Sequence, residues 1–251
     1  MITLATDFGE PYPAVMKGVI ARRTDADTVD IGHEFSRQAP REAAFWLRFV
    51  LPEFPPAVHC AVVDPGVGTE RQALVVRAGD HALVGPDNGL LFPPARALAD
   101  DSELEVFAVR VDEPASNTFH GRDVFAPVAA DCHEVGVENL DRLPALVRTR
   151  DYEQLSLPDP TVDEDGATGE VLAIDGFGNV VTNLPGRLLD GRDSVTVEGR
   201  DYPVATSYAH TDVDTALVTV GSHEHVELAV NQGRGDDRFG LATGDTVQLG
   251  W

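Results

Sequence analysis

The residues best suited to chemistry follow an apolar run in the first half of the chain. The segment Val62-Val63-Asp64-Pro65-Gly66-Val67-Gly68-Thr69-Glu70-Arg71 places a carboxylate where a buried strand is expected to end. Open α/β sheets bind ligands at the carboxyl ends of their strands, and Arg71 can fold back to pair with Asp64. Gly66 and Gly68 can adopt positive φ and let the backbone approach a ligand. A turn with a surface ion pair is an equally good interpretation of this spacing.

A second candidate segment, Ser116-Asn117-Thr118-Phe119-His120-Gly121-Arg122-Asp123-Val124-Phe125-Ala126-Pro127, places three chemically useful side chains directly before an expected helix. His120 has a ring that can hold a water molecule or relay a proton. Asp123 is also explained as a helix cap or first-turn acid, and Arg122 as its ion-pair partner. The segment therefore indicates either a ligand site or a solvated helix start.

Two further loops combine an acid with a glycine at the end of an expected strand. Thr6-Asp7-Phe8-Gly9 follows the first strand, and Gly85-Pro86-Asp87-Asn88-Gly89-Leu90-Leu91 follows another. An acid in the position of Asp7 is typical of a carboxylate that accepts hydrogen bonds from ribose hydroxyls, holds a cation or caps a helix. The Asp87-Asn88-Gly89 triplet is more typical of a tight turn.

The C-terminal part contains a glycine-rich turn with an acid, an aromatic ring and an amide, in Ile174-Asp175-Gly176-Phe177-Gly178-Asn179. A purine can stack on Phe177 while Asn179 contacts its edge, although a hairpin with a core phenylalanine has the same pattern. Farther along, Gly221-Ser222-His223-Glu224-His225 has the His-x-His spacing of some metal sites. The same spacing is typical of an exposed strand edge.

The elements that position these residues differ between the two halves of the chain. Apolar runs and helical spacing alternate in the first half, which predicts an α/β domain with a mostly parallel sheet and helices on both faces. The expected strands are Ile2–Thr6, Thr28–Ile31, Val58–Val63, Ala73–Arg77 and Ala82–Val84, and the expected helices are 14–23, 40–50 and 123–132.

The second half is predicted to be a small antiparallel β-barrel-like domain, because short alternating runs are separated by glycine and asparagine turns. A polar stretch containing Pro158 and Pro160 indicates a linker between the two domains. The predicted organisation is an α/β domain over 1–154, a linker over 155–169 and a β domain over 170–251.

Composition excludes several classes of partner. The chain has 251 residues with 42 acidic and 19 basic side chains, a formal charge of −23, and its only lysine is Lys17. Acids dispersed along the whole chain indicate a salt-adapted, halophilic surface. Such a surface repels nucleic acid and anionic membranes. The two cysteines, Cys60 and Cys132, lie in apolar runs without metal or disulfide spacing, and no targeting segment or membrane span is evident, so we expect a cytoplasmic protein.

Taken together, these segments resemble the S-adenosylmethionine hydrolase family, also called S-adenosylmethionine hydroxide adenosyltransferases, which are relatives of the fluorinase and chlorinase enzymes. The resemblance covers nearly the whole chain and rests on six motifs in order. They are Thr6-Asp7-Phe8-Gly9, Met16-Lys17-Gly18, Val62-Val63-Asp64-Pro65-Gly66-Val67-Gly68, Gly85-Pro86-Asp87-Asn88-Gly89-Leu90-Leu91, Thr118-Phe119-His120-Gly121-Arg122-Asp123 and Asp175-Gly176-Phe177-Gly178-Asn179.

The resemblance implies an enzyme that converts S-adenosylmethionine and water to adenosine and methionine without a metal or other cofactor, as a homotrimer with sites between subunits. It places the catalytic triad of the family on Asp64, Arg71 and His120. It also implies substrate-binding roles for six residues. These are Asp7 at the ribose hydroxyls, Phe8 beside it, Phe177 and Asn179 at the adenine, Asp175 at the methionine ammonium and Ser222 at its carboxylate.

Three other functions stay open on the sequence. The first is a chlorinase-like halogenase, although Asp64 and Val67 replace the tyrosine and threonine of those relatives, and a carboxylate repels halide. The second is a binding protein for S-adenosylmethionine or adenosine that does not turn it over. The third is a metal-dependent phosphoesterase with an acidic site, formed by Asp7, Asp64, Asp87, His120 and Asp123.

Overall fold

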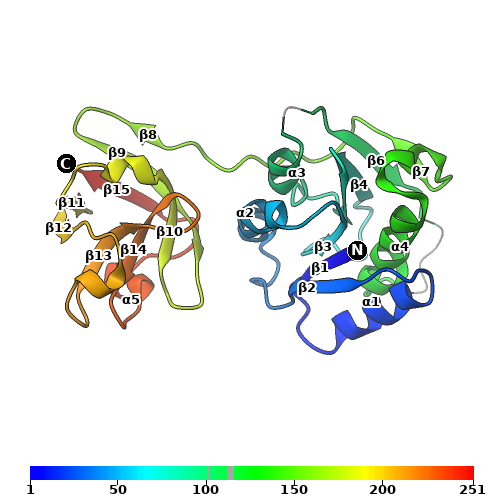
Figure 1. Cartoon of the computed structure of the whole chain (residues 1–251), viewed down its shortest axis with the longest axis horizontal. Helices are drawn as coiled ribbons and strands as arrows, with labels where there is room; N and C mark the ends of the chain where they lie inside the picture. The colour runs from blue at the N-terminus through cyan, green and yellow to red at the C-terminus, as the bar shows by residue number, and fades with distance from the viewer. Residues whose placement is uncertain (101, 112–115) are drawn as a thin grey trace. The chain divides into compact units, whose positions relative to one another are not determined.

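The computed structural model of the chain describes residues 1–100, 102–111 and 116–251. Its backbone separates into two compact units, Met1–Ser156 and Leu157–Trp251 (Figure 1). Each unit has its own sheet and its own hydrophobic core.

A seven-stranded sheet forms the centre of the N-terminal unit, in the order β2-β1-β3-β5-β4-β6-β7. Its strands are β1 (Ile2–Thr6), β2 (Thr28–Gly32), β3 (Val58–Val62), β4 (Ala73–Ala78), β5 (His81–Pro86), β6 (Glu105–Val109) and β7 (Leu146–Arg148). The pairings from β2 to β5 are parallel, and those from β5 to β7 are antiparallel. The predicted α/β class is confirmed, but the sheet is mixed, because β4 and β5 form a hairpin around Gly79-Asp80.

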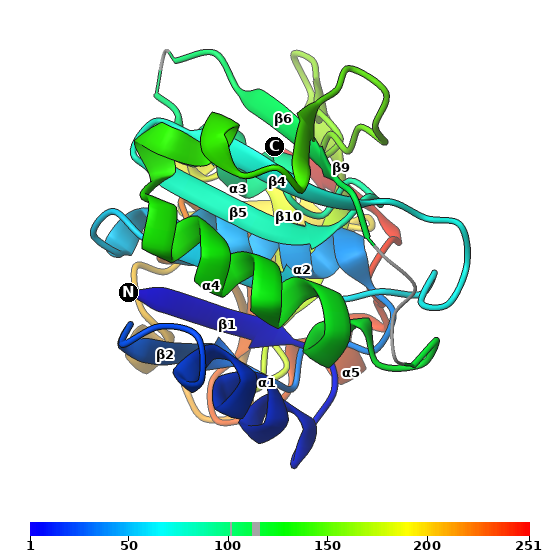
Figure 2. The same ribbon diagram turned by 90° about the vertical axis from the view of Figure 1, so that its right-hand side faces the viewer.

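Helices cover both faces of this sheet (Figure 2). Helices α1 (Tyr12–Ala21) and α4 (Ala126–Val135) pack on one face, and α2 (Pro40–Val50) and α3 (Phe92–Leu98) pack on the other. All four carry proline in the first turn, where its missing N–H costs no helical hydrogen bond. Shorter turns are η1 (Leu51–Glu53), the π-helical η2 (Gly121–Phe125) and η3 (Val137–Arg142). The two faces give the unit two buried apolar clusters.

A hydrogen-bonded histidine pair lies inside the parallel half of the sheet. His59 of β3 is 1% exposed; its Nδ1 lies 2.8 Å from the Thr3 hydroxyl and its Nε2 lies 2.9 Å from Nδ1 of His81. Burial and, to a smaller extent, the neighbouring His81 lower the pKa of His59 to about 3. The ring is therefore neutral near pH 7 and joins β1, β3 and β5 through polar contacts in a largely apolar layer.

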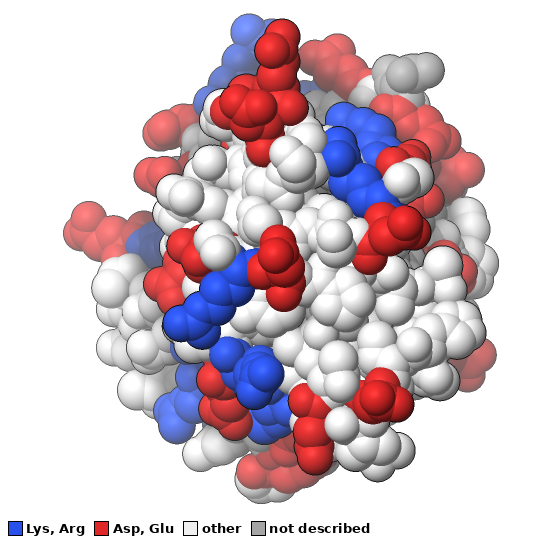
Figure 3. Space-filling model, turned by 90° about the vertical axis from the view of Figure 1, so that its left-hand side faces the viewer, with Lys and Arg blue, Asp and Glu red and all other residues white. Residues whose placement is uncertain are grey.

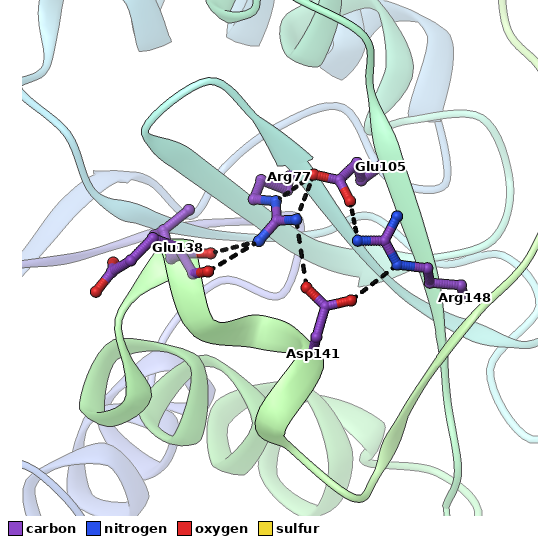
Figure 4. A network of polar contacts seen from close by, with 6 residues as sticks. Arg77, Glu105, Glu138, Asp141 and Arg148 are labelled. Atoms are coloured by element: carbon purple, nitrogen blue, oxygen red, sulfur yellow. Dashed lines mark hydrogen bonds and ion pairs between the residues drawn. The ribbon is translucent and has the colours of Figure 1, made fainter.

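An ion-pair network fastens the antiparallel edge of the sheet to η3 (Figure 4). Arg77 of β4 contacts Glu105 and Asp141, and it donates to the carbonyl oxygens of Val137 and Glu138 at 3.2 and 3.3 Å. Arg148 of β7 reaches the same two carboxylates from the other side. The guanidinium carbons of both arginines also lie within 6 Å of the centre of the Phe107 ring, at 5.8 and 5.4 Å. The two arginines thus share the carboxylates of Glu105 and Asp141 beside the Phe107 ring.

We expect Arg77→Ala to lower the free energy of unfolding by about 2–3 kcal/mol. The Arg77 side chain is only 14% exposed, so its removal leaves two backbone carbonyls and part of Glu105 without their donor. Urea unfolding followed by circular dichroism measures the change. Lys17→Ala is the control, because the Lys17–Asp30 pair is exposed at 35% and 41% and should contribute less than about 1 kcal/mol. Equal losses in the two variants would contradict the prediction.

The C-terminal unit is a nearly closed antiparallel sheet, as predicted, in the order β12-β11-β15-β9-β10-β14-β13 with β8 paired to β9. Its strands are β8 (Thr161–Val162), β9 (Gly166–Ile174), β10 (Val180–Pro185), β11 (Ser194–Val197), β12 (Arg200–Pro203), β13 (Ala216–Val220), β14 (His225–Val230) and β15 (Thr246–Gly250). The short helices are η4 (Gly186–Leu189), η5 (Tyr208–His210) and α5 (Gly235–Phe239). A bridge between Val204 and Val218 joins the two ends of the sheet, and valine and leucine side chains fill the interior.

The stretch 155–169, expected to be a linker, contains β8 and the first residues of β9. Ala167 is buried in the barrel core, so the β structure begins before the predicted boundary. The reason is close backbone packing: a Cβ on Gly169 would lie 2.4 Å from the carboxamide oxygen of Asn183. Glycine and other small residues allow the two strands to lie this close together. They do not produce the alternation of apolar and polar residues that predicts a strand, so the sequence pattern indicated a loop.

Charged side chains on the face of the C-terminal unit shown in Figure 3 occur in small groups, with basic beside acidic, around a broad uncharged area. No continuous basic stripe, of the kind that neutralises nucleic-acid phosphates, crosses this face. Over the described ranges, no helix is long and apolar enough to cross a membrane.

Candidate active site

Asp64 lies just beyond the end of β3, at the carboxyl edge of the parallel half of the sheet. It is 8% exposed. One carboxylate oxygen accepts a hydrogen bond from the Gly66 N–H at 3.1 Å, and the other accepts one from Nη2 of Arg71 at 2.5 Å. Burial raises the pKa of Asp64, and the charge and hydrogen bond of Arg71 oppose that rise. The carboxylate is thus buried, paired and a stronger base than a solvated aspartate.

The two glycines after Asp64 have different roles. Gly68 has φ of +78°, and a Cβ there would lie 2.6 Å from the carbonyl oxygen of Asn117, so only glycine fits. Gly66, which could also adopt positive φ, does not do so. Its N–H is used instead to hold the Asp64 carboxylate.

Arg71 folds back onto Asp64, as its spacing predicted, and it also reaches His120. Its side chain is 10% exposed, and its guanidinium lies 5.3 Å from the centre of the Phe125 ring. Nη1 donates to the carbonyl oxygen of Gln72, and Nη2 lies 3.4 Å from Nδ1 of His120. The guanidinium is therefore held from four sides. This arrangement excludes the alternative of an exposed surface ion pair.

His120 lies at the start of the π-helical turn η2, with its ring directed at Arg71. Because an arginine can only donate, Nδ1 of His120 must accept, which places the hydrogen of a neutral ring on Nε2. Nε2 is buried and has no hydrogen-bond partner within the described structure. Buried unpaired polar atoms are rare in folded proteins, so this N–H is a hydrogen-bond donor of the cluster whose acceptor the described structure leaves open.

Asp64 and His120 open onto a cleft of about 490 Å³ in the N-terminal unit. Asp7 and Phe8, both expected at the site, also line this cleft, and a carboxylate oxygen of Asp7 accepts from the Gln38 N–H at 2.8 Å. The other lining residues are Tyr12, Arg37, Gln38, Val62, Val67, Ser116, Thr118, Phe119, Gly121 and Arg122. The structure thus brings four of the predicted site residues, Asp7, Phe8, Asp64 and His120, to one cleft. Arg71 contacts two of them, Asp64 and His120, without lining the cleft itself.

Three lining residues, Tyr12, Arg37 and Gln38, were not expected from the sequence. Arg37 and Gln38 follow β2, the strand next to β1, so the rule that ligands bind at carboxyl ends of parallel strands could have found them. Tyr12 begins α1 and packs its ring edge-on against Phe119 with centroids 5.3 Å apart. These side chains extend the cleft beyond the predicted set.

The acids of the metal-site alternative have other partners. Asp64 pairs with Arg71, and Asp123 forms a two-pronged pair with Arg122 at 2.6 and 2.8 Å. Asp87 accepts from the Glu153 N–H, and the next residue, Asn88, accepts from the Leu90 N–H in a local turn, as the sequence predicted. In the chain as described, no group of three or more His, Cys, Asp or Glu residues is placed to hold a metal ion. Two of the five residues proposed for this metal site, Asp64 and Asp123, are thus paired with arginines. The geometry therefore does not support a metal-dependent phosphoesterase.

The other predicted binding residues belong to the C-terminal unit. Phe177 is 80% exposed, which contradicts a core role and leaves its flat face open. Asp175 accepts from the backbone N–H groups of Phe177 and Asn179 and from Nδ2 of Asn179, at 2.8 to 2.9 Å. Ser222 is exposed in the turn before β14. The turn between β9 and β10 thus presents one aromatic face beside a fixed amide.

The first histidine of the His-x-His pattern is buried, so the pattern is not an exposed strand edge. His223 is 9% exposed, and its Nε2 lies 3.4 Å from a carboxylate oxygen of Glu227. Nδ1 of His225 is 2.6 Å from the carbonyl oxygen of His223.

Comparison with known proteins agrees with this architecture. The family models of the SAM hydroxide adenosyltransferase N-terminal and C-terminal domains match residues 2–141 and 169–248. The chain belongs to the SAM hydroxide adenosyltransferase family. It is 39% identical to a protein of Salinispora tropica named (R)-S-adenosyl-L-methionine hydrolase, over 99% of this chain and 97% of that one. A Thermus thermophilus protein of the same name is 38% identical over 97% of both chains.

A solved structure of the same fold comes from Thermotoga maritima. This uncharacterized conserved protein has a TM-score of 0.85 and 33% identity, and the match covers 99% of this chain and 100% of that one.

Proposed function

We propose that the protein hydrolyses S-adenosyl-L-methionine to adenosine and L-methionine. The observation that carries this proposal is the buried contact of Asp64, Arg71 and His120 at the edge of the 490 Å³ cleft. The family match and the printed names of full-length relatives at 38–39% identity support it.

The chemistry needs activation on one side only. Water attacks the ribose 5′ carbon in line with the sulfonium sulfur, the C–S bond breaks, and the electron pair leaves with methionine as a neutral thioether. No acid is required for such a leaving group, whereas the water must lose a proton during or after the attack. The buried Asp64 carboxylate beside the Arg71 guanidinium can supply the base that removes this proton.

The triad residues divide this work. Asp64 accepts the proton of the water, and its raised pKa makes it a better proton acceptor near pH 7. Arg71 orients that carboxylate and stabilises the negative charge shared between carboxylate and developing hydroxide. His120 lines the cleft, and the role of its Nε2–H in this proposal is to hold the water oxygen.

The binding roles follow the chemistry of the remaining side chains. Asp7 accepts from the two ribose hydroxyls, with Phe8 packed beside the sugar. Phe177 stacks on the adenine, and Asn179 contacts its edge. Asp175 pairs with the methionine ammonium, and Ser222 binds its carboxylate.

We further propose a homotrimer with sites between subunits, working in a salty cytoplasm without a cofactor. Supporting points are the location of binding residues in both units of the chain, the charge of −23 and the two buried free thiols of Cys60 and Cys132. Light scattering of the purified protein at high salt measures the subunit number. A monomeric mass in that measurement would contradict the trimer.

The test of the reaction is to incubate the protein with S-adenosylmethionine in ¹⁸O-labelled water and separate the products. We expect adenosine that carries ¹⁸O at the 5′ oxygen, together with unlabelled methionine, in the presence of chelator and with either chloride or nitrate as the salt. A 5′-chloro nucleoside that forms only in chloride would instead indicate a halogenase. Substrate recovered intact would indicate a binding protein.

A further inference from the structure

A chain of polar side chains lies behind the proposed adenine contact in the C-terminal unit. Nδ2 of Asn179 lies 3.4 Å from the Tyr208 hydroxyl, which donates to a carboxylate oxygen of Glu227 at 2.5 Å. The other carboxylate oxygen of Glu227 faces Nε2 of His223 at 3.4 Å. Asn179, Glu227 and His223 are each less than 10% exposed, at 6%, 4% and 9%. The catalytic steps proposed above use neither Tyr208 nor Glu227.

The direction of each hydrogen bond in this chain follows from its end at Glu227. A carboxylate only accepts, so the single proton of the Tyr208 hydroxyl is committed to it. Burial and the neighbouring Glu227 raise the pKa of Tyr208, which keeps that proton in place. The Tyr208 oxygen can then only accept from Asn179. Asp175, also a carboxylate, accepts the second amide hydrogen of Asn179 at 2.9 Å.

Both hydrogens of the Asn179 side-chain amide are thus used within the protein. The side-chain oxygen is the part of the carboxamide left to meet a ligand. We propose that Tyr208 and Glu227 are positioning residues, which hold the Asn179 carboxamide with its oxygen outward and so select a purine with a 6-amino group over one with a 6-oxo group. The proposal rests on the proposed function, because it takes Asn179 as the adenine contact. A 6-amino group donates to this oxygen, whereas a 6-oxo group would oppose it with a second acceptor.

The carboxylate of Glu227 determines the direction of the hydrogen bonds from Asn179 to Tyr208 and from Tyr208 to Glu227. Without its carboxylate, the Tyr208 hydroxyl can turn its proton toward Asn179, and the carboxamide then has a reason to rotate. Asp175 alone continues to favour the original orientation, so the expected effect is a partial loss of discrimination. A fully reversed preference is not expected.

The test measures binding of adenosine and of inosine, its 6-oxo counterpart, by calorimetry, together with steady-state kinetics on S-adenosylmethionine. In Tyr208→Phe and in Glu227→Leu, which leaves no acceptor for the Tyr208 hydroxyl, we expect the adenosine-to-inosine affinity ratio to fall about tenfold. KM for S-adenosylmethionine should rise by a similar factor, and kcat should change less than about threefold. Tyr202→Phe is the matched control, because Tyr202 lies in the same unit and packs on Phe239 through its ring.

An affinity ratio in both variants equal to that of Tyr202→Phe would overturn the proposal. So would a fall in kcat with KM and the ratio unchanged, since a positioning role for the base predicts the opposite division. If Glu227→Leu fails to fold, as judged by circular dichroism, Tyr208→Phe alone decides, because Tyr208 is 41% exposed. Binding is measured without turnover, so a failure of the hydrolysis proposal is seen separately, as intact S-adenosylmethionine in a protein that still distinguishes adenosine from inosine.

Discussion

Asp64→Asn is expected to lower kcat for adenosine formation by about 10³-fold or more. The substitution keeps the size of the side chain and an oxygen for the Gly66 N–H, but it removes the only negative charge in the triad. A carboxamide accepts no proton from water, and its N–H₂ group meets the Arg71 guanidinium as a second donor. General bases contribute about 10²–10⁴-fold to such reactions, and here the partner of Arg71 is lost as well.

Single-turnover kinetics with chromatographic detection of adenosine measures this effect, and calorimetry with S-adenosylmethionine shows whether binding is retained. Asp30→Asn is the control, since Asp30 lies on the surface beside Lys17 in the same unit. Activity within tenfold of the unsubstituted protein would remove Asp64 from the role of base. Loss of binding together with activity would make it a binding residue instead.

Arg71→Ala is expected to reduce kcat by about 10²-fold or more and to move the acidic limb of the pH–rate profile to higher pH. Burial raises the pKa of Asp64, and Arg71 is the first group that lowers it. Without the guanidinium, the carboxyl group stays protonated to a higher pH. Because the ionised form is the base, activity then disappears at a higher pH as the solution is acidified.

The pH dependence of kcat/KM between pH 5 and 9 tests this shift. Arg71→Lys retains a positive charge and should show a smaller displacement, although it cannot reach both Asp64 and His120 with a planar fork. Arg23→Ala serves as a control, because Arg23 pairs with Asp131 on the surface. An acidic limb that stays in place in Arg71→Ala would show that Asp64 is not the titrating group.

Part of the architecture followed directly from residue order. Apolar runs such as Val58–Val62 are buried on both faces of a sheet, so they predict central strands irrespective of their partners. Strand direction is set by connections. The short connection through Gly79-Asp80 allows only a hairpin between β4 and β5, whereas β6 and β7 join the antiparallel half through segments without strand spacing. The early start of the barrel was hidden for the reason seen at Gly169, where close packing selects a small residue.

Some residues of the candidate site could likewise be predicted from the sequence, and others could not. Asp64 and Arg71 are seven residues apart after a strand, so local geometry alone predicts their pairing. His120 is distant in sequence, and only the resemblance to a family connected it with them. Glu227 had a signal that was overlooked, since it is a carboxylate with apolar neighbours on both sides in β14 (His225–Val230), where a buried acid needs a partner.

The division of the chain into two compact units separates two kinds of change that evolution or design can make. The groups proposed to activate water all precede Ser156, and those proposed to recognise the base all follow it. Substitutions in one unit can then alter the attacking species while the other retains its choice of base, and the reverse also holds. The proposed activation of water and the proposed choice of base are in this sense carried by different segments of one polypeptide.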